Sequence, residues 1–129
     1  MSYNFRIDDQ ALKAKLRRFS QGFANSSEGE AVIRKSTLAG MKVAILEAPE
    51  KYGDLKRSIQ LKPIEKSGSG VEGGFDVNIK YAAPQNYGWK DKRTGNWHPG
   101  KFFMEKGYEA TEEKAEKEMK KAIKAFLSR

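Results

Sequence analysis

The sequence predicts an α+β fold with N-terminal helices, a small antiparallel sheet, and a C-terminal helix packed on the sheet. Three patterns lead to this prediction. Apolar residues recur with a helical period in the first part of the chain, they alternate with polar residues in the middle, and glutamates give way to lysines along the tail. The length of 129 residues favours a single domain over 1–129. We expect a helical part at about 8–48, a sheet and loop at about 54–100, and a helix at about 102–128.

Two helices are expected in the N-terminal part. Asp8 is a suitable N-cap for the first, whose apolar stripe is formed by Leu12, Leu16, Phe19 and Phe23. Residues 25–27, Asn-Ser-Ser, supply a new start signal for a second helix over 28–48, which Pro49 ends. Gly40 and its small neighbours in this helix would allow another element to approach closely.

The sheet is expected from two strands. Over 58–64 apolar and polar residues alternate, and Pro63 indicates a strand that ends early or lies at an edge. Residues 66–70 form a flexible connection. Over 71–81 the alternation is unbroken, which predicts a strand with one buried and one solvated face.

The segment 81–104 is rich in aromatic residues, glycines and cations, so it predicts an ordered, functional loop rather than a linker. Its 89–98 part could contribute further strands. After it, residues from about 101 to 129 predict a helix with glutamates toward its start and lysines toward its end, in agreement with the helix dipole.

The residue types needed for catalysis or metal binding are scarce. The chain has no cysteine, and His98 is its single histidine, so a thiolate site or a zinc site of the usual kind is not expected. Asp54 and Asp76 are far apart in sequence and predict no carboxylate pair. The 68–70 run Gly-Ser-Gly lacks the lysine of a phosphate-binding loop. We therefore expect a protein that is not an enzyme and uses no cofactor or metal.

The formal net charge of +8 indicates attraction to polyanions, although it also suits solubility or an acidic protein partner. The aromatic residues of the 81–104 segment lie beside Lys90, Lys92 and Arg93, an arrangement that fits stacking on single-stranded nucleic acid or anchoring of a protein interface. We favour the protein interface. No apolar run is long enough to cross a membrane, which predicts a protein made in the cytoplasm with no membrane partner.

Three motifs, in order, resemble a family of small tail-completion and head-to-tail joining proteins of long-tailed bacteriophages and prophages. Residues 52–59, Tyr-Gly-Asp-Leu-Lys-Arg-Ser-Ile, are similar to the family pattern Thr-Gly-x-Leu-Arg-x-Ser-Ile. Residues 81–89, Tyr-Ala-Ala-Pro-Gln-Asn-Tyr-Gly-Trp, are similar to Tyr-Ala-x-x-x-Glu-x-Gly-Thr, with Asn86 at the acidic position and Trp89 at the small one. Residues 99–104, Pro-Gly-Lys-Phe-Phe-Met, match Pro-x-x-Phe-hydrophobic. The resemblance covers about residues 30–128.

The resemblance implies a non-enzymatic virion structural protein that acts in the neck or tail-completion step and links the tail tube to the head connector. It implies a homo-oligomeric ring formed on assembly, neighbouring connector and tail proteins as partners, and a location in the host cytoplasm and then in the virion neck or tail. A weak, non-specific contact with DNA is also expected. The interface residues expected on this basis are Lys56, Arg57, Tyr87, Trp89, Lys90, Arg93, Trp97 and Phe102. The alternative function is a basic nucleic-acid-binding protein, and a small hydrolase is a more remote one.

Overall fold

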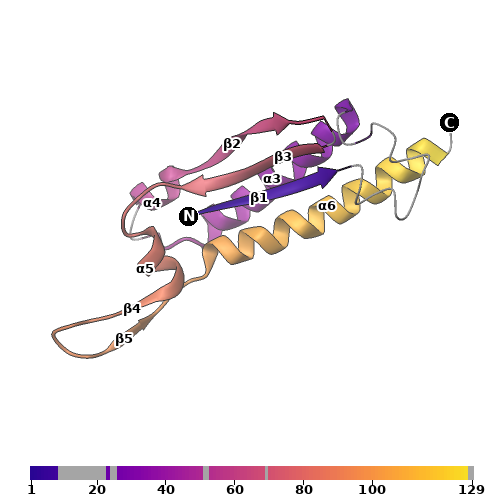
Figure 1. The fold of residues 1–129 in the computed structure, drawn as a ribbon. Coiled ribbons are helices and arrows are strands. Elements are labelled where there is room, and N and C mark those ends of the chain that lie inside the picture. The colour runs from indigo at the N-terminus through magenta and orange to yellow at the C-terminus, as the bar shows by residue number, and fades with distance from the viewer. Residues whose placement is uncertain (9–22, 24–25, 51–52, 69, 128–129) are drawn as a thin grey trace.

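The computed structural model describes residues 1–8, 23, 26–50, 53–68 and 70–127, and the chain adopts the α+β fold that the sequence predicts. Helices α3 (Ser27–Glu47) and α6 (Phe103–Leu127) pack against each other and on one face of a three-stranded antiparallel sheet (Figure 1). The remaining elements, in chain order, are β1 (Ser2–Asp8), α4 (Gly53–Ser58), β2 (Ile59–Lys66), β3 (Gly70–Val77), α5 (Ala82–Tyr87), β4 (Gly88–Lys90) and β5 (Trp97–Pro99).

The N-terminal strand β1 was not predicted. The sheet has the strand order β1-β3-β2, and β1 pairs with β3 from Ser2 opposite Asp76 to Asp8 opposite Gly70. Asp8, expected as a helix N-cap, is therefore the last residue of a strand. The sequence does contain the alternation that is typical of a strand, because Tyr3, Phe5 and Ile7 alternate with polar residues in β1. The apolar positions expected at 12, 16 and 19 lie outside the described residues.

Strand β2 begins close to the predicted position and lies at an edge of the sheet, as Pro63 indicated. Its register with β3 shifts between Lys62 and Glu65, because proline has no N–H to donate to the ladder. The central strand β3 ends at Val77 rather than at residue 81. Both neighbouring strands also end at this point. Val77 pairs with Ile59, the first residue of β2, and the Val77 N–H donates to the carbonyl of Met1 (3.2 Å), which directly precedes β1.

Helix α3 has the predicted bounds to within one residue. The hydroxyl of Ser26 caps it by accepting a hydrogen bond from the Gly29 N–H (3.2 Å). The predicted close approach is made by α6, because a Cβ placed on Gly40 would overlap the carbonyl of Gly107 and the hydroxyl of Thr111. The two helices therefore pack with their backbones nearly in contact.

The apolar core forms two clusters along the sheet. One contains Phe75 of β3, Leu55 of α4 and Phe103 of α6, which are all fully buried. The other joins Ile33 of α3 to Val71 of β3 and includes the buried Phe23. Together they fix the helix pair on the sheet. The segment between β3 and α6 contributes Ala82, with Tyr81 packed against it, and the rest of that segment lies outside the two clusters.

That segment, expected as a loop over 81–104, contains three short elements. Helix α5 leads into β4, which pairs with β5 in a separate two-stranded sheet, so the strands anticipated in the 89–98 region are present. The β4–β5 hairpin projects away from the body of the molecule beyond the start of α6 (Figure 1).

Candidate interaction surface on the projecting hairpin

The hairpin is held to the body at its base by Asn86. This side chain is fully buried, and its oxygen accepts a hydrogen bond from the N–H of Met104 (2.9 Å). Its amide nitrogen donates to both carboxylate oxygens of Glu105 (3.1 and 2.8 Å). The carbonyl of Asn86 also accepts from the N–H of Phe102 (2.9 Å). One residue of α5 thus fixes the first turn of α6 and closes the chain on either side of the hairpin.

Two glycines allow the strands to meet at this base. Gly88 has φ +100, a conformation that L side chains rarely adopt, and a Cβ there would overlap Trp97. A Cβ on Gly100 would overlap the carbonyl of Asn86 and the backbone nitrogen of Gly88. The glycines therefore permit a backbone approach that no other residue type could make.

Within the hairpin, Trp89 lies opposite His98, and Lys90 lies opposite Trp97. The loop at the tip closes through its own backbone, since the N–H of Asp91 donates to the carbonyl of Asn96 (2.8 Å). The side chain of Asp91 in addition accepts from the N–H of Arg93 (2.9 Å). The hairpin is consequently defined by local hydrogen bonds, and its tip extends beyond the core.

Four aromatic side chains are exposed on and beside this hairpin. Their exposed fractions are 61% for Trp97, 50% for Tyr87, 46% for Phe102 and 40% for Trp89. Trp89 stacks on the imidazole of His98, with ring centroids 4.1 Å apart, while Tyr87 meets Phe102 edge to face at 6.4 Å. Because residues directly opposite in an antiparallel pair share a face, the neighbours Trp89 and Trp97 project from opposite faces of the hairpin. We call Tyr87, Trp89, Trp97 and Phe102 the aromatic hairpin surface.

Phe102 is held in a strained conformation. Its φ of 50 lies in the left-handed region, and it is the one non-glycine residue in the described part of the chain with positive φ. That conformation costs a residue with a Cβ roughly 1–2 kcal/mol. The chain thus keeps a half-exposed aromatic residue at a position where glycine would fit more easily.

The expected cations Lys90 and Arg93 are exposed on the hairpin, together with Lys92. The two other expected cations lie elsewhere, on α4. Lys56 donates from Nζ to the carbonyl of Ile45 (2.7 Å) near the end of α3, and Arg57 pairs with Asp54 (2.7 Å). The structure therefore brings together six of the eight expected interface residues and separates Lys56 and Arg57 from them.

The residues considered for catalysis do not converge. His98 lies in the stack with Trp89, and Asp54 is the partner of Arg57. Asp76 lines an open polar hollow at the end of the sheet with Ser2, Ser58 and Gln60. Of the 68–70 run, Gly70 is the first residue of β3 and its carbonyl accepts a hydrogen bond from the Ser67 N–H (2.9 Å), while residue 69 lies outside the described residues. Among the residues that the structure describes, no group of three His, Asp or Glu side chains is placed to hold a metal ion.

Sequence reasoning did not foresee the role of Asn86. The sequence places Asn86 where the resembled motif has an acidic residue, but its burial and its contacts with the start of α6 depend on tertiary structure. The close approach at Gly100, which closes the base of the hairpin, likewise follows from tertiary structure and not from local pattern.

Over the described ranges, no helix combines the length and apolar character needed to cross a membrane. Comparison of the chain with protein-family models, with curated protein sequences and with solved structures finds no match.

Proposed function

We propose that this protein is a non-enzymatic structural component of phage assembly that acts in the neck or tail-completion step and joins the tail tube to the head connector. The proposal is supported by the three motifs that resemble the phage family, and above all by one structural observation. That observation is the aromatic hairpin surface, which projects from the body on a base fixed by Asn86.

Exposed aromatic side chains favour a protein partner. Burying apolar surface contributes about 25 cal/mol per Å², and aromatic residues are enriched among the residues that dominate binding energies. In the described part of the chain, the large apolar side chains that are exposed are Met1, Leu46, Leu61 and the four members of the aromatic hairpin surface. The apolar exposure is thus concentrated on one projection.

The shape of the hairpin suits insertion between two surfaces. Trp89 and Trp97 lie on opposite faces, so a partner that covered a single face would leave one indole in water. A two-stranded hairpin alone is marginally stable, and a partner that packs on both faces would stabilise it. Docking of this kind joins two different surfaces of a repeated subunit, which is the type of contact that closes a ring.

The decisive mutational test compares the double variant Trp89→Ala/Trp97→Ala with Leu46→Ala as the control. Leu46 is 75% exposed on α3, so its truncation removes an exposed apolar side chain from another place. We expect the hairpin variant to stay folded but to lose association with co-expressed connector and tail-tube proteins from the same genome, and the control to retain it. Measured by light scattering after size exclusion, retention of the complex by the hairpin variant would contradict the proposed role.

Gene context tests the biological assignment separately. We expect genes for portal, capsid and tail-tube proteins beside the gene for this chain. A neighbourhood that contains no virion gene would count against a role in phage assembly.

A further inference from the structure

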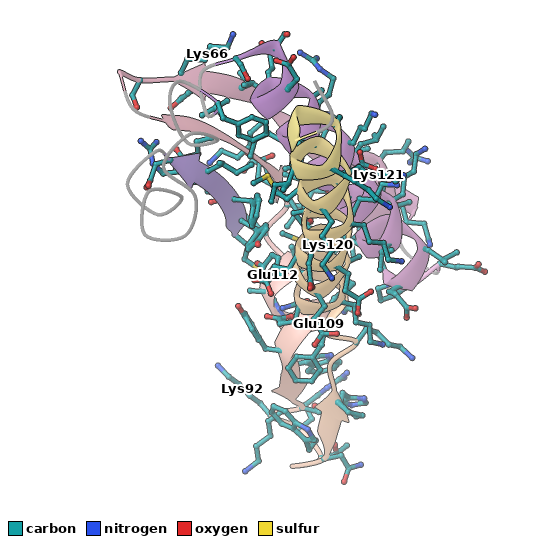
Figure 2. The ribbon with its side chains drawn as sticks, turned by 90° about the vertical axis from the view of Figure 1, so that its right-hand side faces the viewer. Lys66, Lys92, Glu109, Glu112, Lys120 and Lys121 are labelled. Carbon is teal, nitrogen blue, oxygen red and sulfur yellow. The ribbon has the colours of Figure 1, made fainter. Side chains whose placement is uncertain are left out.

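A second charged surface lies on the α3–α6 pair, toward the end of α6 that is farther from the hairpin. Figure 2 shows Lys120 and Lys121 at this end of α6, whereas Glu109 and Glu112 lie closer to the hairpin that carries Lys92. Glutamates are therefore more frequent toward the start of α6 and lysines toward its end, and the lysine-rich end has no role in the hairpin contact proposed above.

The centre of this surface is Glu118, a buried carboxylate that holds three lysines. It lies 3.3 Å from Nζ of Lys114, 3.7 Å from that of Lys121 and 3.7 Å from that of Lys35 on α3. The carboxylate is only 9% exposed, whereas the lysine side chains are 40–75% exposed. Burial raises the pKa of Glu118, but its hydrogen bond to Lys114 and the charges of Lys121 and Lys35 outweigh burial and leave that pKa lowered. One negative charge thus positions three positive ones, and a net positive charge faces solvent.

The lysines continue along α6 in a row. Lys114, Lys117, Lys121 and Lys124 follow one another at spacings of three, four and three, which places them on one side of a helix over about 15 Å. With Lys35 they form what we call the lysine ridge. The glutamates at 105, 109, 112 and 116 repeat at spacings of four, three and four and lie about a third of a turn away. Glu112 contacts Tyr3 of β1 (3.4 Å), so the acidic row is on the β1 side of α6 and the ridge on the α3 side.

A second carboxylate shared by two cations lies near the start of α3. Glu30 near the start of α3 pairs with both Arg34 (2.6 Å) and Lys66 (2.7 Å). As at Glu118, the cations outnumber the carboxylate that they share. Glu28 in the first turn of α3 and Glu65 next to Lys66 offset this charge, so the positive excess is carried by the lysine ridge.

The composition of the ridge favours phosphate over a protein surface. None of the large apolar side chains exposed in the described residues belongs to it, so its described part offers no anchor for a protein interface and no ring on which a base could stack. Lysine ammonium groups act as point charges that attract phosphate without reading sequence. We propose that the lysine ridge binds the phosphate backbone of duplex DNA independently of sequence. The proposal does not depend on the role of the hairpin.

The test uses the full chain, a short fluorescently labelled DNA duplex and two triple variants that each remove three positive charges. The ridge variant is Lys35→Gln/Lys117→Gln/Lys121→Gln, which leaves Lys114 as the partner of Glu118. The matched control is Lys90→Gln/Lys92→Gln/Arg93→Gln on the hairpin. Circular dichroism checks that both fold, and fluorescence anisotropy measures affinity between about 50 and 200 mM salt.

We expect the ridge variant to lose about tenfold or more in affinity at low salt, and the slope of log K against log salt to flatten by about two to three, because each lost phosphate contact contributes about 0.9. The hairpin control should keep its slope and lose less than about threefold. Equal losses in both variants, or no binding by the wild type at low salt, would overturn the proposal. DNA binding that survives in the ridge variant while self-association is lost in sedimentation would assign the ridge to a second copy of the chain instead.

Failure of the DNA-binding proposal can be distinguished from failure of the proposed assembly function. A hairpin variant that still binds connector and tail-tube proteins would refute the assembly contact and leave the DNA result unchanged. Loss of DNA binding in the hairpin control alone would place DNA on the hairpin and refute the ridge.

Discussion

The side-chain amide of Asn86 donates hydrogen bonds to both carboxylate oxygens of Glu105, at 3.1 and 2.8 Å, from a fully buried position. A third bond, from the N–H of Met104 to the Asn86 oxygen, uses the remaining polar atom of the side chain. A neutral amide is required here, because it donates to a carboxylate and accepts from a backbone N–H at the same time. This pair makes the base of the hairpin a fixed part of the body.

We expect Asn86→Asp to destabilise the protein by about 2–4 kcal/mol at neutral pH, because the donor is lost and a second carboxylate is buried beside Glu105. Protonation of the introduced carboxyl relieves the repulsion, so the difference from the wild type should be smaller near pH 4 than near pH 7. Urea denaturation at the two pH values measures both quantities. Asn96→Asp, at an exposed site on the hairpin, is the control and should change little.

At position 102 we expect glycine to give a more stable protein than alanine, which is the reverse of the usual order. The φ of 50 at this position strains any residue with a Cβ, so Phe102→Gly is expected to be more stable than Phe102→Ala by about 1 kcal/mol. Both variants lose the contact with Tyr87 equally. Thermal denaturation of the two variants compares them directly, and a more stable alanine variant would show that the left-handed conformation is not maintained in solution. In the assembly assay, both variants should bind more weakly than the wild type.

The packing of α3 on α6 predicts opposite effects at two neighbouring positions. Gly40→Ala should destabilise the protein by about 1–3 kcal/mol, because the new methyl group overlaps the carbonyl of Gly107 and the hydroxyl of Thr111. Ser36→Ala, one turn earlier, removes a buried hydroxyl that has no hydrogen-bond partner among the described residues, and should leave stability unchanged or raise it by up to about 1 kcal/mol. Both changes raise helix propensity, so a loss of stability at Gly40 alone reports the helix contact. Chemical denaturation gives both values.

Ionisation of two tyrosines should destabilise the protein at alkaline pH. Burial, with Glu112 as the next cause, raises the pKa of Tyr3 to about 12, and burial, with Glu105 next, raises the pKa of Tyr108 to about 12. The two rings stack between β1 and α6 with centroids 4.3 Å apart. Between pH 10, the pKa of a tyrosine in the unfolded chain, and about pH 12, its pKa in the folded protein, the unfolded state binds fewer protons than the folded state. The contribution of these tyrosines to stability is therefore fully present below pH 10 and is lost as the pH rises toward 12.

The absorbance of tyrosinate at about 295 nm should show these two residues titrating later than an exposed tyrosine. In Tyr3→Phe the loss of stability between about pH 10 and 12 should be smaller than in the wild type. An equal loss in the two proteins would show that Tyr3 does not contribute to the alkaline transition. Tyr87→Phe, at a half-exposed site on the hairpin, provides the comparison.

Local pattern in the sequence was sufficient for α3, α6 and the starts of β2 and β3. Each is long or strongly periodic, and Ser26 and Pro49 mark the limits of α3. Pro63 indicated an edge strand because the missing N–H is a property of the residue itself. Gly40 indicated a close approach for the same kind of reason, although the sequence did not say that α6 would make it. Of the candidate interface, the sequence identified the aromatic residues and the cations beside them.

What the sequence left open depends on partners that are distant along the chain. β1 is a strand because β3, about seventy residues later, offers it a pairing edge, and β3 ends at Val77 because both its neighbours end there. Lys56 is held by the end of α3 rather than presented on the hairpin. Asn86 and Glu118 became significant only when folding buried them beside Glu105 and Lys35. Periodicity and turn residues act over a few positions, whereas strand ends, buried polar contacts and charged surfaces are fixed by segments that meet only in the folded chain.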